Sequence, residues 1–250
     1  ETFGFDNMCQ PSERPSKIVI PYALGEADIK SWNVSDGILA LFSSDADDAV
    51  NFLKSIAVKF LYSYTGSDKQ ILYLSKKTND EMNNFLRRLS DTLSKDLFFS
   101  GIRRTDSFDF EHDLINAFSL LKRELEERSA LLDKENFADI LAYNKKSSVD
   151  VKPPVLVILN NYPFGFEHAV DLDYFCENGR KAGIYFVVIQ SGEELKSSAW
   201  SSETIADPQF YCDEMPVISG EEIVFGSDVY ERLKIDSATC DALVSALSKG

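Results

Sequence analysis

The apolar positions of the chain fall into two patterns, short runs that are apolar throughout and longer stretches with helical spacing. Residues 155–159 are five consecutive aliphatic residues between two prolines and two asparagines. A run this short predicts a strand buried on both faces, as found in the middle of a parallel sheet. Residues 38–42, 70–74 and 184–189 have the same character and predict three more strands.

Helical spacing is clearest after residue 46. Apolar residues such as Ala49, Leu53, Ile56 and Phe60 repeat at steps of three and four, which predicts a helix over 46–64. With a strand before it and another after it, this helix completes a right-handed βαβ unit. Further helices are expected over 82–93 and 110–132, near 137–143, before Gly179, and over 237–247.

The other strand candidates are shorter. Residues 17–21 are expected at a sheet edge, because Pro21 cannot donate to a central ladder. Residues 97–99 and 222–225 are also short strand candidates, and the polar stretch 191–208 is expected to be a mobile loop. Strands that alternate with helices in this way predict an α/β fold, with a mostly parallel sheet and helices on both faces.

Charge and composition limit the partners. Asp and Glu outnumber Lys and Arg by 41 to 26, a formal net charge of -15, so a nucleic acid would be repelled. No apolar run reaches the roughly 20 residues that a membrane span needs. No metal site is expected, because His112 and His168 lack neighbours at ligand spacing. The cysteines fit neither a zinc site nor a disulfide framework and favour a reduced cytosolic setting: Cys9, Cys176, Cys212 and Cys240.

The long helix expected over 110–132 carries a dense run of charge. Every residue from Lys122 to Arg128 except Leu125 is charged. The simplest interpretation is a solvated helix face, opposite an apolar stripe that includes Leu114 and Phe118.

The turn between the strand at 38–42 and the helix at 46–64 is where phosphate-binding loops occur, because a helix N-terminus presents free N–H groups and partial positive charge. A working loop needs glycines, a lysine for the phosphates and a Ser or Thr for Mg²⁺. This turn has no glycine and no lysine, and its carboxylates would repel a polyphosphate. An ordinary helix capped by Asp is the alternative interpretation. The turn reads Ser43-Ser44-Asp45-Ala46-Asp47-Asp48-Ala49-Val50.

Amide side chains follow two of the predicted strands. In open α/β sheets ligands bind at the carboxyl ends of the strands, and phosphate-hydrolysing enzymes carry a carboxylate there for Mg²⁺ or water. Asn160 and Asn161 occupy this place instead, and Gln190 ends the strand at 184–189. None of these amides is a base. They either hydrogen-bond a ligand or close a turn.

Six stretches resemble, in the same order, segments of one known family: 36–44, 121–128, 142–144, 155–162, 179–184 and 187–190. They resemble, in turn, the approach to the Walker A loop, the charged helix before Walker B, its continuation, the Walker B strand, a Gly-Arg segment, and the next strand with its glutamine. The family is the FtsK/SpoIIIE superfamily of motor ATPases, and the resemblance is closer to the last ATPase-like domain of the type VII secretion ATPases EssC and EccC.

The resemblance implies a three-layer P-loop NTPase-like fold of the RecA/FtsK kind. It covers most of the chain between Ser35 and Gln190 and implies a single domain, residues 1–250, within a longer protein. Residues 1–30 are expected to be a lead-in segment, and residues 191–250 match the family poorly. A chain that begins with Glu rather than Met agrees with a piece of a larger protein.

The departures from the family fall on the residues that do chemistry. Ala49 falls at the lysine position, Val50 at the Ser or Thr position, and Asn160 at the Walker B aspartate. The resemblance therefore implies a non-hydrolysing domain with no catalytic residue and no cofactor, which binds ATP and Mg²⁺ weakly or not at all. Its role would be regulatory, structural or substrate-recognising. One alternative is an active ATP-binding or DNA-translocating domain with displaced catalytic residues, and another is a free-standing interaction domain.

The resemblance also implies partners and a location. The partners are sibling ATPase domains of the same chain, and secreted helical substrates or their signal segments. The domain would be cytoplasmic, without membrane contact of its own, in a membrane-anchored and oligomeric parent. Arg180 is a candidate for reaching a neighbouring subunit and Gln190 for sensing the site. Phe164 and Phe166 either line a peptide-binding pocket or pack under the sheet.

Overall fold

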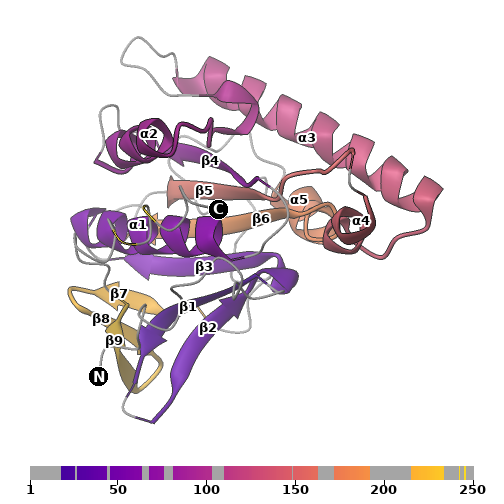
Figure 1. The fold of residues 1–250 in the computed structure, drawn as a ribbon. Coiled ribbons are helices and arrows are strands. Elements are labelled where there is room, and N and C mark those ends of the chain that lie inside the picture. Colours follow the sequence, from indigo (N-terminus) through magenta and orange to yellow (C-terminus); the bar gives the residue numbers. More distant parts are fainter. Residues whose placement is uncertain are drawn as a thin grey trace.

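A computed structural model shows one sheet of nine strands in the described residues, with helices on both of its faces (Figure 1). The strand order is β2-β1-β9-β8-β7-β3-β6-β5-β4. The predicted loop at 191–208 and nearly all of the predicted helix at 237–247 lie outside the described part. The described residues are 18–25, 27–43, 46–63, 68–75, 81–102, 110–147, 149–162, 172–191, 215–233, 242 and 245.

The parallel half of the sheet consists of the four strands that the apolar runs predict. They are β3 (Ile38–Ser43), β6 (Ile184–Ser191), β5 (Val155–Tyr162) and β4 (Gln70–Ser75), adjacent in this order and all parallel. Every residue of β5 is buried. This matches the expectation for a strand that is covered on both faces.

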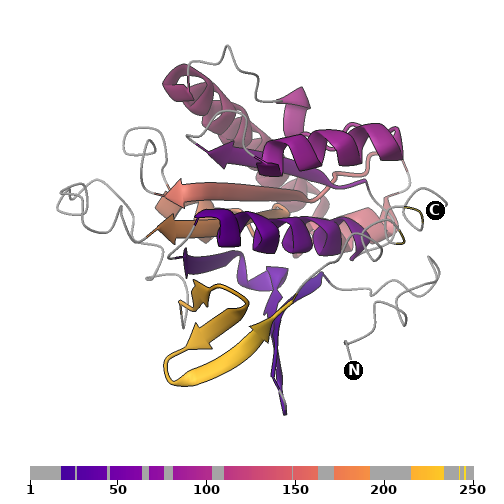
Figure 2. The same cartoon turned by 90° about the vertical axis from the view of Figure 1, so that its left-hand side faces the viewer.

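Helices cover the two faces of this half (Figure 2). α1 (Ala46–Tyr62) and α2 (Glu81–Leu93) share one hydrophobic core with one face of the strands. α3 (Phe110–Glu135) and α5 (Leu172–Asn178) share a second core with the opposite face. The prediction of a three-layer α/β fold is therefore confirmed. Among the described helices, none is long and apolar enough to cross a membrane.

The other half of the sheet is largely antiparallel and was only partly predicted. β7 (Val217–Ser219) lies parallel to β3 and begins a meander with β8 (Glu222–Phe225) and β9 (Asp228–Arg232). β9 pairs with β1 (Val19–Leu24), and β1 pairs with β2 (Ile29–Asn33). These five strands extend the sheet beyond β3, and residues of β1, β7 and β8 share the core of α1 on one face.

The sequence interpretation of the first strand was wrong in one respect. β1 is not an edge strand, because it lies between β2 and β9, and β2 forms the edge. Pro21 is tolerated because β9 pairs only with Ala23 and Leu24, and the pairing with β2 shifts register directly after Pro21.

The expected strand at 97–99 is also absent as such. Only Phe98 bridges to Ile71, and a 3₁₀ turn over Phe99–Gly101 follows it. A second 3₁₀ turn, Val34–Asp36, connects β2 to β3. Both turns are short connections at the ends of strands.

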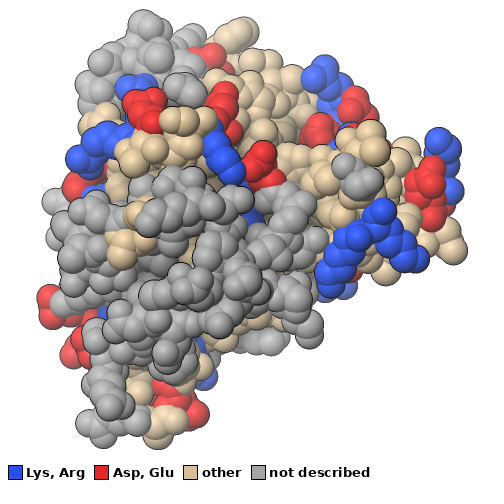
Figure 3. Space-filling model, in the orientation of Figure 1, with Lys and Arg blue, Asp and Glu red and all other residues tan. Residues whose placement is uncertain are grey.

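The charged helix face is solvated along most of its length, and Figure 3 shows acidic and basic side chains interspersed over α3 and α4 (Ile140–Lys146). Arg128 is the exception, because it is buried, and its assignment to a solvated face was wrong. Its Nε donates to Glu124 Oε1 at 2.7 Å and its Nη1 donates to the Ala182 carbonyl at 2.9 Å. Arg128 thereby fastens α3 to the turn that precedes β6.

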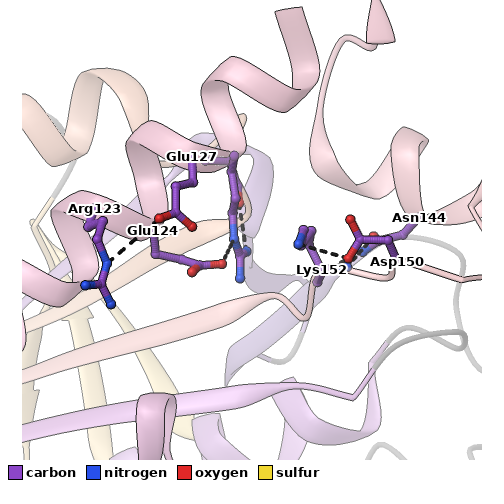
Figure 4. A network of polar contacts seen from close by, with 8 residues as sticks. Arg123, Glu124, Glu127, Asn144, Asp150 and Lys152 are labelled. Carbon is purple, nitrogen blue, oxygen red and sulfur yellow. Dashed lines mark hydrogen bonds and ion pairs between the residues drawn. The ribbon is translucent and has the colours of Figure 1, made fainter. Parts of the chain in front are cut away.

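The Asn144 side chain holds the segment before β5 through two hydrogen bonds to the Lys152 backbone (Figure 4). Asn144 of α4 donates from Nδ2 to the carbonyl of Lys152 at 2.7 Å and accepts from the Lys152 N–H at 2.9 Å. The amide therefore pairs with Lys152 as a neighbouring strand would. This gives Asn144 a structural role just ahead of the central strand.

Gly183, in the turn before β6, has a left-handed backbone conformation and lies close to Ile140. Its φ is +74°, and a Cβ there would lie 2.3 Å from Ile140 Cγ2. Gly183→Ala is expected to destabilise the protein by about 2–3 kcal/mol through left-handed strain and overpacking. Gly220, with φ +57° and nothing within 4 Å of its Cβ position, is the control. Gly220→Ala is expected to lose only about 1 kcal/mol, and equal losses in urea unfolding would contradict the steric argument.

Candidate functional site at the carboxyl edge of the sheet

The four parallel strands end side by side at one edge of the sheet. The register pairs Ser75 with Asn160, Asn160 with Ile189, and Ser43 with Ser191. Ligands bind at this edge in open α/β folds, because the strand ends and the following loops converge there. The structure therefore brings together the ends of the strands whose polar residues the sequence singled out.

The two asparagines at the end of β5 are held by side chains of β4. Asn160 is buried, and its Nδ2 donates to the hydroxyl oxygen of Tyr73 at 3.1 Å. Ser75 Oγ donates to Asn161 Oδ1 at 3.4 Å. Tyr73 and Ser75 were not recognised from the sequence, although parallel pairing of β4 beside β5 would have placed them there.

Asn161 does not close a turn, which corrects that alternative. β5 continues through it to Tyr162, with a bulge between Asn160 and Tyr162. Asn161 adopts φ +65°, a left-handed conformation that asparagine tolerates better than most residues. The bulge re-aims the end of β5, so both amides lie at the edge.

Two of the amides carry buried polar atoms that no other described residue satisfies. They are Asn160 Oδ1 and both Oε1 and Nε2 of Gln190, whose side chain is 0% exposed. Alternation along the strands directs Asn160 to the α1 side and Gln190 to the α5 side. An unsatisfied buried polar group costs about 1–3 kcal/mol, so these positions favour a hydrogen-bonding neighbour from outside the described residues.

The helix start behaves as the sequence predicts, and α1 begins at Ala46. Ala49 and Val50 are 1% and 7% exposed and belong to the core under α1. Ser43 is buried at the end of β3. Ser44 and Asp45, and the side chains of Ala46, Asp47 and Asp48, lie outside the described part. Ala49 and Val50, which fall at the lysine position and the Ser or Thr position of the family's loop, therefore contribute to packing.

The lysines of α1 lie far from this turn. Lys54 pairs with Glu81 of α2. Lys59 is buried at a position 13 residues along the helix from Ala46, about 20 Å at 1.5 Å per residue. Burial lowers the pKa of Lys59 to about 8. Neither ammonium group can replace a lysine at the start of α1.

Arg180 does not join the site. It is exposed in the turn before β6, at the amino edge of the sheet, where its Cβ lies 3.2 Å from the position that a Cβ on Gly37 would take. It precedes the first residue of β6, Ile184, and the six residue steps from Ile184 to Gln190 span about 20 Å at 3.3 Å per residue. Arg180 therefore stays a prediction for an interface and not for this edge. Phe164 and Phe166 lie outside the described residues.

The chemistry of the edge is that of neutral amides and hydroxyls. The described ends of β3, β4, β5 and β6 carry no carboxylate, and the described residues contain no cluster of His, Cys, Asp or Glu suited to a metal ion. Mg²⁺ is usually held through one or two carboxylates, and an amide cannot activate water as a base. The edge can hydrogen-bond a ligand through these amides and hydroxyls.

No family model and no curated protein matches the sequence. Solved structures do match the fold. EssC (ATPases 2 and 3) from Geobacillus thermodenitrificans is 14% identical with a TM-score of 0.63, over 95% of this chain and 49% of that one. Thermomonospora curvata EccC (ATPases 2 and 3) in complex with a signal sequence peptide is 9% identical with a TM-score of 0.57, over 94% and 47%. The pCW3 conjugation coupling protein TcpA with ATPγS is 11% identical with a TM-score of 0.60, over 96% and 72%.

These likenesses establish the fold. The chain has the architecture of the ATPase domains of EssC and EccC and of the coupling protein TcpA, as the sequence motifs predict. It spans about half the length of the EssC and EccC structures.

Proposed function

We propose that this chain is a non-hydrolysing, ATPase-like domain that acts through protein contacts in a protein-secretion motor of the type VII kind. One observation supports the proposal: Asn160, at the position that resembles the Walker B aspartate, is a buried amide, and Ala49 and Val50 at the start of α1 belong to the core. A domain with this fold but without the charged groups for phosphoryl transfer can still act by binding other proteins through its surface.

The fold likeness supports the choice of motor. The EssC and EccC structures each contain ATPases 2 and 3, and the EccC structure is in complex with a signal sequence peptide. We propose by analogy that sibling ATPase domains and secreted helical substrates, or their signal segments, are the partners of this domain. Its place would be the cytoplasmic side of a membrane-anchored, oligomeric parent protein.

Calorimetric titration of the chain with ATP and Mg²⁺ tests the loss of nucleotide chemistry. The expected result is no saturable binding tighter than about 1 mM, a free energy of about -4 kcal/mol. The alternative is an active ATPase that binds with displaced residues, and micromolar affinity together with turnover would establish it. The net charge of -15 opposes a DNA-translocating role.

A second measurement tests the secretion role separately. The chain, titrated with the signal segment of a small helical secretion substrate encoded beside it, is expected to bind saturably. Absence of binding to each such neighbouring substrate, with nucleotide binding also absent, would favour a free-standing interaction domain instead.

A further inference from the structure

The antiparallel half of the sheet leaves one of its faces without a described cover. On the α1 side, residues of β1, β7 and β8 such as Ile20, Ile218 and Ile223 are buried in the core. The opposite side continues the face that α3 and α5 cover on the parallel strands. No residue of β1, β2, β7, β8 or β9 belongs to the core that those two helices form, so far as the chain is described.

This outer face carries aliphatic side chains aligned across the strands. The register places Val217 opposite Val224 and Val224 opposite Val229, so the three valines form one row. Leu24 and Ile29 form a second apolar pair across β1 and β2. Val229 is 55% exposed and Ile29 41% exposed. Val217, Val224 and Leu24 are half-buried. Aliphatic side chains left partly exposed next to one another mark interaction sites in soluble proteins.

Two glutamates extend the row of the apolar pair, next to the row of valines. Glu222 and Glu231 stand directly opposite each other in the antiparallel pair β8–β9, and Glu231 is also opposite Leu24. Both are exposed, and neither forms an ion pair with another residue in the described part of the chain. Like charges directly opposite on one face destabilise a sheet. A cation placed between them would remove that repulsion and complete the surface.

We propose that this outer face docks a basic, aliphatic segment of a partner protein. Its lysine or arginine lies between Glu222 and Glu231, and its aliphatic side chains cover Val224 and Val229. A second copy of this chain fits poorly, because each copy brings a net charge of -15 and a pair of facing glutamates. The same charge disfavours an anionic membrane surface. The inference does not depend on the state of the nucleotide site.

A peptide of alternating leucine and lysine is the probe, and fluorescence anisotropy at physiological ionic strength is the measurement. Saturable binding to the wild-type chain is expected. Glu231→Lys and Val229→Ser are each expected to weaken it by about tenfold or more, since one removes the charge complement and the other the aliphatic contact. Glu126→Lys, an equal charge change on the exposed side of α3, is the matched control and is expected to leave binding within about twofold.

Thermal unfolding of the same variants separates docking from folding. Glu231→Lys converts two facing glutamates into an opposite-charge pair, so it is expected to raise the unfolding temperature while it weakens peptide binding. A probe that does not bind the wild type would overturn the proposal. So would equal weakening by Glu126→Lys, which would reveal attraction by net charge alone, or unchanged binding by both face variants.

Discussion

Ala49→Lys is expected to destabilise the protein by about 3–5 kcal/mol and to leave ATP binding absent. Ala49 is 1% exposed and packs in the core beneath α1. A lysine there must either bury an ammonium group without a partner or force its stem into a filled core, and both are strongly unfavourable. In a working phosphate-binding loop a lysine at this position is tolerated, because it points at the phosphates.

Asn51→Lys provides the matched control for Ala49→Lys, because Asn51 is exposed on the same helix two residues further on. This change is expected to stay within about 0.5 kcal/mol of the wild type. Urea unfolding measures both variants, and calorimetry with ATP and Mg²⁺ measures the gain of affinity. A stable Ala49→Lys protein that binds ATP would mean that the loop is intact apart from its lysine, contrary to the proposed loss of function.

The parallel strands and their helices were predictable because burial on both faces leaves a strong signal. β5 and β6 are apolar almost throughout, and α1 repeats its apolar residues with helical spacing. The antiparallel half was harder to predict, because half of each strand faces away from the core and β7 has only three residues. The signal that was available lies in the hairpin turns: Gly220 and Gly226 each open a two-residue loop with positive φ.

The candidate site was predictable in position but not in geometry. The ends of β5 and β6 identified Asn160 and Gln190 correctly as residues of the carboxyl edge. The bulge at Asn161 was not predictable, because its φ of +65° depends on how β5 meets β6. The burial of Arg128 was missed for a related reason. A charged run indicates a solvated face, and only tertiary structure reveals that Arg128 has a partner in the turn before β6.

Arg128→Ala is expected to lower the free energy of unfolding by about 3–5 kcal/mol. The guanidinium is 2% exposed and bonds both Glu124 and the Ala182 carbonyl. Burial lowers the pKa of Arg128, while the hydrogen bond and charge of Glu124 raise it. Truncation would leave a cavity and an unsatisfied carbonyl beneath the turn into β6. Arg128→Lys is expected to lose roughly half as much, because it keeps a charge but not the fork of donors.

Arg123→Ala is the control for Arg128, because Arg123 also faces a glutamate four residues away on α3, Glu127, at 3.9 Å. Both of those side chains are more than half exposed, so the pair is expected to contribute at most about 0.5 kcal/mol. Urea unfolding compares the variants, and amide hydrogen exchange locates the effect. Arg128→Ala is expected to lose protection first at Gly183 and Ile184, where the turn enters β6, and equal stability of the two alanine variants would mean that Arg128 does not hold α3 to the sheet.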